Sequence, residues 1–371
     1  MPFVPEISKL YVLDALNSNH QHGDGPFTKY ASKLVSDLVG GGHVLLTPSC
    51  THALEMAGML AKLSPGDEVI LPSFTFTSAA TAITKFGATP VFVDIDEVTK
   101  CIDVNLARKA VTNKTKAISW VNYAGSAPNI AELQKIAKDF GLLLIEDNAH
   151  GLGGSYKGKP LGSFGDFATQ SFHATKNIQC GEGGALVINN SKFIERAEII
   201  REKGTDRSRF VRGEIQKYQW IDKGSSYLLA ESLAAILLGQ LENFDEIQNS
   251  RLRYWESFRS AFPAESLTER IKPMVIDNND VNIAHMFYLL ISNDLDAKKI
   301  ENYFDSKNVS LYKHYQPLHS SIAASQIGTL TNGECEISTK LSKSLFRIPL
   351  WSFMEPRIIE KITSTLAGIR I

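Results

Sequence analysis

The chain has few cysteines for its length, and they are scattered. Its 371 residues include four, Cys50, Cys101, Cys180 and Cys335, and no two of them form a C-x-x-C pair. This spacing argues against a disulfide framework and a cysteine-based zinc site, and it fits a reducing cytosol. The loop at residues 20–26 carries two histidines without a cysteine nearby, so no metal site is predicted there.

The sequence also lacks an excess of charge of either sign and has no long apolar run. The formal net charge is −1, so no overall field favours nucleic acid or an anionic membrane. The longest apolar runs, such as residues 141–145 and 233–238, are far too short to span a bilayer. The first residues show neither the basic nor the apolar region of a signal peptide, which predicts a cytoplasmic location.

Motifs of two other protein classes are missing as well. No G-x-G-x-x-G follows the first expected strand, which makes a nicotinamide dehydrogenase a poor interpretation. Neither a helix-turn-helix segment nor a basic stripe indicates a DNA-binding regulator. What is present is typical of a soluble globular protein, with 43% hydrophobic and 21% charged residues and enough length for two domains.

From residue 43 onward, apolar segments that favour strands alternate with segments that favour helices. This alternation predicts an α/β fold with a mainly parallel seven-stranded sheet between helices. We assign residues 1–245 to this large domain, with a helical segment at its start, and residues 246–371 to a smaller α+β C-terminal domain. The seven strands are expected at 43–46, 68–71, 90–94, 117–121, 142–146, 166–172 and 185–188, and the helices between the earlier ones at 51–62, 78–86, 105–111 and 129–140.

A lysine follows the strand expected at residues 166–172 and lies just before the glycine-rich stretch C-G-E-G-G. A neutral lysine amine, here that of Lys176, forms a Schiff base with an aldehyde cofactor. Pyridoxal 5'-phosphate (PLP) also needs an acid for its ring nitrogen, donors for its phosphate and a flat surface for its ring. Taken alone, Lys176 would be interpreted as an exposed loop lysine. It is interpreted as a cofactor anchor because candidates for all three partners occur upstream.

Asp147 and His150 are the candidates nearest the ring. Asp147 closes the apolar run of residues 142–145, where a carboxylate is costly to bury unless it meets a cation or donors. A protonated pyridine nitrogen is such a cation; a helix N-cap is the alternative. Beside Lys176, the cofactor interpretation is favoured. His150 would bond a cofactor oxygen, pack on the ring or serve as a structural histidine.

The phosphate candidates lie where one helix begins and where one strand ends. Ser49, Cys50 and Thr51 open the helix expected at 51–62, and helix N-termini bind phosphate through free N–H groups. Ser171 precedes Lys176 by five residues and is a further donor candidate. For the flat surface, Phe74 or Phe76 would stack on the ring, and by default either would be core.

With these residues assembled, the chain resembles the DegT/StrS family of PLP-dependent sugar-nucleotide aminotransferases. Each stretch is weak alone, and together they are specific. The similar stretches are G-D-E-V-I (66–70), P-S-F-T-F (72–76), Y-A-G (123–125), E-D-N-A-H (146–150), Y-K-G (156–158), S-F-H (171–173), K-N (176–177) and G-E-G-G (181–184).

The resemblance implies a PLP fold type I homodimer with active sites shared between subunits. Lys176 would be the Schiff-base lysine and proton shuttle, and Asp147 would pair with the pyridine nitrogen. His150 matches a family position near the cofactor, and Phe76 matches the ring-stacking aromatic. Cys50, Thr51 and Ser171 match phosphate-site positions. Ser226 stands where many members have an asparagine that reaches the partner's cofactor phosphate.

The resemblance also implies a substrate class. The stretches at 201–205 and 222–227 look like the subgroup that makes dTDP-4-amino-4,6-dideoxygalactose for the enterobacterial common antigen and related surface glycans. We therefore expect transfer from L-glutamate to a dTDP-4-oxo-6-deoxyhexose, with pyridoxamine phosphate between the two half-reactions. His314, Tyr315 and His319 are placed at the sugar pocket, with a structural turn as the alternative.

Several points stay open at this stage. The segment that contains Arg207 is either a solvated loop or a contact to the substrate diphosphate. The acceptor could instead be a 3-oxo-6-deoxyhexose, a UDP-linked 4-oxo sugar or a cyclitol ketone. A PLP-binding regulator without catalysis is an alternative of another class.

Overall fold

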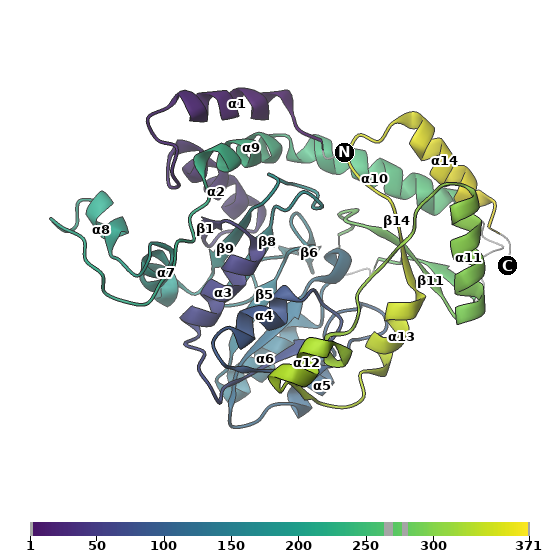
Figure 1. Ribbon diagram of the computed structural model, residues 1–371, viewed down its shortest axis with the longest axis horizontal. Helices are drawn as coiled ribbons and strands as arrows, with labels where there is room; N and C mark the ends of the chain where they lie inside the picture. The colour runs from purple at the N-terminus through teal and green to yellow at the C-terminus, as the bar shows by residue number, and fades with distance from the viewer. Residues whose placement is uncertain (1–2, 263–269, 277–280, 370–371) are drawn as a thin grey trace.

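The seven strands predicted from the sequence lie side by side in one sheet. The computed structural model describes residues 3–262, 270–276 and 281–369 (Figure 1). The sheet has eight strands in the order β1-β9-β8-β5-β4-β2-β3-β13. The pairs from β8 to β13 are parallel, whereas β9 is antiparallel to both β8 and β1. The strands are β1 (His43–Thr47), β2 (Glu68–Pro72), β3 (Thr89–Val93), β4 (Thr115–Val121), β5 (Leu143–Asp147), β8 (Phe167–Ser171), β9 (Gly184–Ile188) and β13 (Leu330–Thr331).

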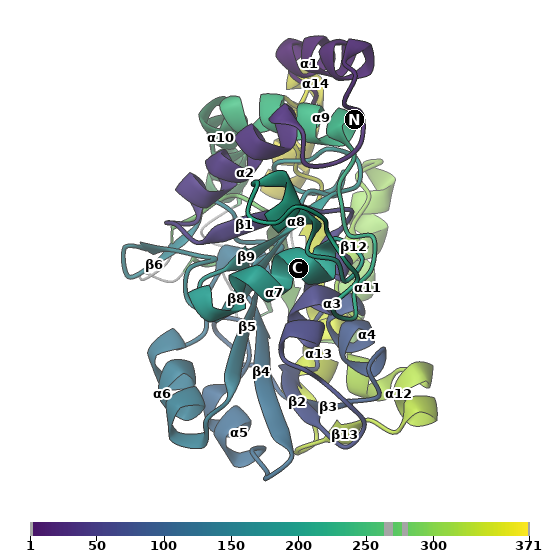
Figure 2. The ribbon, with the colours of Figure 1, turned by 90° about the vertical axis from the view of Figure 1, so that its left-hand side faces the viewer.

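Helices cover both faces of this sheet, as Figure 2 shows. Side chains alternate along a strand, so β2 contributes to two cores. Val69 and Leu71 pack in the cluster beneath α3 and α4, and Ile70 packs in the cluster beneath α5 and α6. The covering helices are α3 (Cys50–Leu60), α4 (Ser78–Thr84), α5 (Val104–Lys109), α6 (Ile130–Phe140) and α7 (Ile194–Arg201).

A third group of helices packs beside β1 and β9. Here α1 (Glu6–Asn17) and α2 (Pro26–Leu38) contact α9 (Glu231–Glu242). The segment that follows α7 leads into the short helix α8 (Arg207–Val211), which projects from the body of the molecule (Figure 1). None of the helices in the described part of the chain is long and apolar enough to cross a bilayer.

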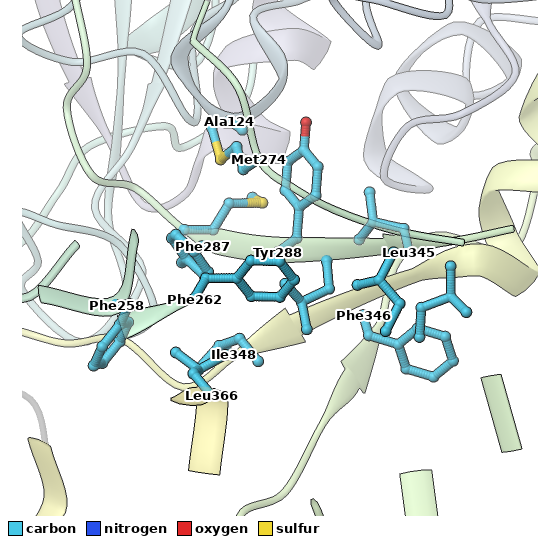
Figure 3. Packing of buried hydrophobic residues seen from close by; sticks show 14 of the residues in the cluster. Ala124, Phe258, Phe262, Met274, Phe287, Tyr288, Leu345, Phe346, Ile348 and Leu366 are labelled. Carbon is cyan, nitrogen blue, oxygen red and sulfur yellow. The ribbon is translucent and has the colours of Figure 1, made fainter. Parts of the chain in front are cut away.

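The C-terminal part forms a smaller, antiparallel sheet in the order β10-β11-β14-β12. Helices pack against it around a core rich in phenylalanine, which Figure 3 shows from close by. Its strands are β10 (Ile271–Pro273), β11 (Phe287–Ile291), β12 (Tyr312–Lys313) and β14 (Leu345–Ile348). Its helices are α10 (Phe244–Ala261), α11 (Asp294–Ser306), α13 (Glu336–Ser344) and α14 (Pro356–Ala367), whereas α12 (Ile322–Ile327) packs through Ala324 against the core of the large sheet.

Besides the continuous chain, a strand pairing and buried hydrogen bonds also join the two parts. β13 comes from the C-terminal part and pairs with β3 of the large sheet, an eighth strand that the sequence did not predict. The buried carboxylate of Asp94, which follows β3, accepts hydrogen bonds from the backbone N–H groups of Ile337 and Ser338 in α13. These contacts hold the C-terminal part over one edge of the large sheet.

Candidate active site

A cavity of about 590 Å³ lies at the carboxyl ends of the central strands. Parallel sheets bind ligands at this edge, because the loops that leave the strands meet there. The large part supplies the residues after β1, β2, β5 and β8, and the C-terminal part closes the opposite wall. Among the predicted residues, those that line the cavity are Ser49, Cys50, Thr51, Phe76, Asp147, His150, Ser171, Lys176, His314 and Tyr315.

Lys176 enters the cavity from a tight turn after β8. The backbone N–H of Lys176 donates to the carbonyl of His173 at 2.9 Å, and that of Ala174 donates to Gly181 at 2.9 Å. Burial lowers the pKa of Lys176 to about 8, although Cys50 and Asp147 act in the opposite direction and raise it. A lysine with this pKa is partly neutral near pH 8, so its amine is available as a nucleophile.

Asp147 is buried at the end of β5 and faces the same cavity. Its Oδ1 accepts the backbone N–H of Ala149 at 3.1 Å, in a turn that does not lead into a helix. The helix N-cap alternative is therefore wrong. Burial raises the pKa of Asp147, while the Ala149 N–H and Lys176 lower it. A cation at the cavity end of this carboxylate would stabilise its charged form.

The neighbouring Glu146 is also buried but serves the fold. Its carboxylate accepts the side-chain amide of Asn122 at 2.8 Å and the backbone N–H groups of Gly162 and Phe164 at 2.7 and 3.0 Å. Because its oxygens are satisfied by these donors, Glu146 holds the loop that follows β7 (Lys159–Pro160) against the sheet.

The first turn of α3 presents N–H groups and hydroxyls to the cavity. Ser49 caps the helix by accepting the His52 N–H at 3.2 Å, and the Thr51 hydroxyl lies 2.7 Å from that of Ser78. Gly184 passes so close to this turn that an added Cβ would come within 2.4 Å of the Cys50 nitrogen. Only glycine permits that approach. Free N–H groups at a helix N-terminus can bind an anion, and Ser171 lines the same cavity.

The structure distinguishes the two phenylalanines, Phe74 and Phe76, that the sequence offered as candidates to stack on the cofactor ring. Phe74 is 1% exposed and belongs to the core shared with the C-terminal part. Phe76 is 58% exposed and lines the cavity, where its ring lies 6.3 Å from that of Tyr315. Of the two, Phe76 is therefore the phenylalanine available to a ligand in the cavity.

The wall from the C-terminal part is built of histidine, tyrosine and arginine. His150 stacks on His285 with ring centroids 4.3 Å apart, and its Nε2 lies 3.3 Å from the Tyr315 hydroxyl. Arg347 donates through Nη1 to Nε2 of His314. A guanidinium cannot accept, so His314 is neutral, carries its proton on Nδ1 and donates to the Tyr123 hydroxyl 3.3 Å away. Burial, Arg347 and Lys176 lower the pKa of His314 to about 3.

Three predicted site residues do not line this cavity. Arg207 donates to Glu202 Oε1 at 2.6 Å, and Ser226 pairs with Glu202 through its backbone. His319 lies behind the cavity, with its Nδ1 2.6 Å from the Ser73 hydroxyl. Conversely, the sequence reasoning missed His285 and Arg347. The available signal was a single polar residue within each of the otherwise apolar stretches A-H-M-F-Y and L-F-R-I-P.

A model of the DegT/DnrJ/EryC1/StrS aminotransferase family matches residues 5–367. The chain belongs to this family. Uncharacterized protein MJ1066 of Methanocaldococcus jannaschii is 34% identical over 301 residues, which cover 80% of this chain and 77% of the relative. The spore coat polysaccharide biosynthesis protein SpsC of Bacillus subtilis is 32% identical over 306 residues, again 80% and 77% of the two chains.

Solved structures share the family fold across the chain. The putative sugar aminotransferase Spr1654 from Streptococcus pneumoniae has a TM-score of 0.88 at 25% identity and covers 99% of this chain and 97% of its own. PseC of Helicobacter pylori, an aminotransferase involved in the biosynthesis of pseudoaminic acid, has a TM-score of 0.87 at 23% identity over 98% and 96% of the chains. The fold is PLP type I, as predicted.

PLP is the cofactor of this family, and Spr1654 has been solved in PLP and pyridoxamine phosphate forms. The donor set of the cavity fits it. A lysine of lowered pKa, a buried carboxylate, an exposed aromatic ring and a helix N-terminus all face one space. The protein is thus a PLP-dependent aminotransferase. Among the described residues, no group of three or more histidine, cysteine or acidic side chains could hold a metal ion.

Proposed function

We propose that this enzyme transfers the amino group of L-glutamate to C4 of a dTDP-4-oxo-6-deoxyhexose. The product would be a dTDP-4-amino-4,6-dideoxyhexose of galactose configuration, for a surface glycan. The observation that carries the reaction class is that Lys176 and Asp147 line the same cavity. The sugar rests on the subgroup-like stretches at 201–205 and 222–227. The name of SpsC, a polysaccharide biosynthesis protein, is consistent with a glycan product.

Each large-domain residue has a defined task in this proposal. When bound, PLP supplies an electron sink that lowers the barrier to proton loss at the carbon bearing the amine. Lys176 would hold the cofactor through its Nζ, and the same amine would serve as the group that takes up and returns the substrate proton. The carboxylate of Asp147 keeps the pyridine nitrogen protonated by charge. Phe76 and His150, which also line the cavity, would contact the ring, and His150 is held by its stacking on His285.

The phosphate would lie at the start of α3. Backbone N–H groups there and the hydroxyls of Ser49, Thr51 and Ser171 are its donors, with Cys50 packed against Thr169 at 3.5 Å. With the phosphate held there, Asp147 would be the residue to pair with the ring nitrogen and Lys176 the residue to hold the aldehyde carbon.

The sugar nucleotide would enter past the wall of His314 and Tyr315. Both line the cavity, whereas His319 does not and is bonded to the hydroxyl of Ser73, so it is not assigned to the sugar pocket. Arg207 lies in the projecting segment near Ser226 and is away from the cavity of its own chain. We therefore assign Arg207 and Ser226 to the partner's site in a homodimer. The exposed Val211 and Trp220 of this segment, 68% and 80% accessible, support burial against a second copy.

Purified protein with PLP and L-glutamate should aminate dTDP-4-oxo-6-deoxyglucose in preference to its 3-oxo isomer and to a UDP-linked 4-oxo sugar. Product formation is followed by mass spectrometry, which also identifies the position of the new amine after hydrolysis. Lys176→Ala should lower turnover by at least roughly 1,000-fold, while Lys135→Ala on exposed α6 should not change it. Full transamination by Lys176→Ala would refute the reaction, and a preference for the 3-oxo isomer would refute the sugar.

A further inference from the structure

A second cavity, of about 410 Å³, lies on the other side of Lys176. It shares Thr175, Lys176, His285 and Arg347 with the cofactor cavity and extends between the two parts of the chain. Its far wall comes from α9, α10 and the segment after β14, where Trp351 lies. A molecule in this cavity would thus have one end at the reacting lysine.

The lining of this cavity is positively charged and uncompensated. It includes Lys176, Arg251 and Arg347, and none of the described residues that line it is acidic. Elsewhere the chain pairs its buried or half-buried arginines with carboxylates, as Arg201 with Asp24 and Arg196 with Asp222. A buried charge without a partner is costly, which indicates that an anion completes the site.

Arg251 is the deeper of the two guanidiniums. It is 3% exposed, and its Nε and Nη2 donate to the backbone carbonyls of Ala284 and His285 at 3.0 and 2.8 Å. These are neutral acceptors, so the charge of Arg251 is solvated but not balanced. Within the described chain, no carboxylate forms a salt bridge with it. Burial and the charge of Arg347 lower the pKa of Arg251 to about 9, as expected where two guanidiniums lie near each other.

Arg347 is positioned at the boundary of the two cavities. It stands on β14, opposite Tyr288 of β11, and its Nη1 is held by neutral His314. Its Nε is buried and has no hydrogen-bond partner among the described residues. A guanidinium fixed on one side with a free donor on the other matches the geometry of a carboxylate.

We propose that this cavity binds the amino donor as a dicarboxylate. Arg347, beside Lys176, takes the carboxylate next to the amino group, and Arg251 faces the second carboxylate deeper in the cavity. The two arginines would then select a five-carbon acidic donor over alanine. The assignment rests on the proposed aminotransferase function and adds the residues that recognise the donor.

The first test needs no turnover. Isothermal titration calorimetry of the PLP-loaded protein should show that glutarate, an unreactive dicarboxylate, binds roughly 10- to 100-fold more tightly than butyrate, which lacks the second carboxylate. Arg347→Gln should weaken both acids, whereas Arg251→Gln should weaken glutarate alone and remove the difference. Arg347→Lys should recover part of the affinity. Arg253→Gln, on the exposed face of the same helix α10, is the matched control and should bind as wild type.

Equal affinity of the wild-type protein for glutarate and butyrate would overturn the proposal. Because this comparison uses only the wild-type protein, it tests the proposal even if a variant does not fold. Wild-type affinity for glutarate in Arg347→Gln would overturn it as well. A separate reaction distinguishes failure of the proposed function. Wild-type protein loaded with pyridoxamine phosphate should aminate the dTDP-4-oxo sugar in a single turnover without glutamate. If it does not, the function is wrong, whatever the calorimetry shows.

Discussion

The lowered pKa of Lys176 implies that the active-site lysine destabilises the cofactor-free fold. Burial moves this pKa from its ordinary value of 10.5 to about 8. At about 1.4 kcal/mol per pKa unit, holding the charged amine in the cavity costs about 3 kcal/mol. The cost is reduced by cavity water, since the side chain is only partly buried by its accessible surface. We therefore expect the substitution Lys176→Met, which keeps the volume and removes the charge, to stabilise the cofactor-free protein by about 1 to 3 kcal/mol at pH 7.

The pH dependence separates this effect from better packing. Below pH 8 both the folded and the unfolded chain hold the lysine proton, so the full cost is present. Between pH 8 and 10.5 the unfolded chain binds the proton more strongly than the folded one, and stability rises with pH. Above pH 10.5 the lysine is neutral in both states. The advantage of Lys176→Met over wild type should therefore shrink from pH 8 and approach zero at pH 10.5.

Urea unfolding followed by circular dichroism, at equal protein concentration and at pH 7, 9 and 10.5, measures this difference. Lys135→Met is the control, because Lys135 is exposed on α6. It should change the unfolding free energy by less than about 0.5 kcal/mol at every pH. A Lys176→Met protein that is no more stable than wild type at pH 7, or whose advantage does not depend on pH, would refute the reasoning.

Other residues of the cavity give three further predictions. Asp147→Asn should lower turnover by roughly 100- to 1,000-fold in steady-state assays, because an amide cannot hold a pyridine nitrogen protonated by charge; turnover near wild type would contradict the role. Thr51→Val should weaken cofactor binding by roughly 5- to 30-fold in a fluorescence titration, because it removes one donor to the phosphate, and an unchanged affinity would exclude that contact. Burial lowers the pKa values of His150, His285 and His314, so below about pH 6.5 the unfolded chain binds protons that the fold does not. Stability should then fall by up to roughly 1.4 kcal/mol per pH unit for each histidine, and His314→Asn should reduce that slope by one proton in urea titrations from pH 7 to 5; a slope equal to wild type would contradict it.

The strands of the large sheet were predictable because each has a local signal. Expected bounds such as 43–46 and 185–188 differ by one residue from β1 and β9, since apolar runs bounded by glycine, proline and polar residues are a property of the segment itself. The order of the strands has no such signal. β13 is only two residues long, Leu330–Thr331, and joins β3 because the C-terminal part is already held there by Asp94. Two residues are too few to show a hydrophobic periodicity in the sequence. This strand is therefore determined by contacts between segments that are distant in the sequence.

The same distinction divides the active site. Asp147 ends β5, and Lys176 and the Ser49–Thr51 turn follow β8 and β1; these three strands run in the same direction within one sheet, which brings the residues to one edge. Arg347 lies in β14 of the other sheet and His285 in the segment just before β11, and each interrupts an apolar stretch as a single polar residue. From the sequence, such a residue is better explained as a satisfied core side chain. Its role appears only when the C-terminal part closes over Lys176, because closure gives Arg347 a neutral histidine on one side and a cavity free of acidic lining on the other. The acid and the lysine proposed to act on the cofactor therefore both belong to the part that forms the large sheet, whereas the proposed recognition of the donor depends on how the two parts pack.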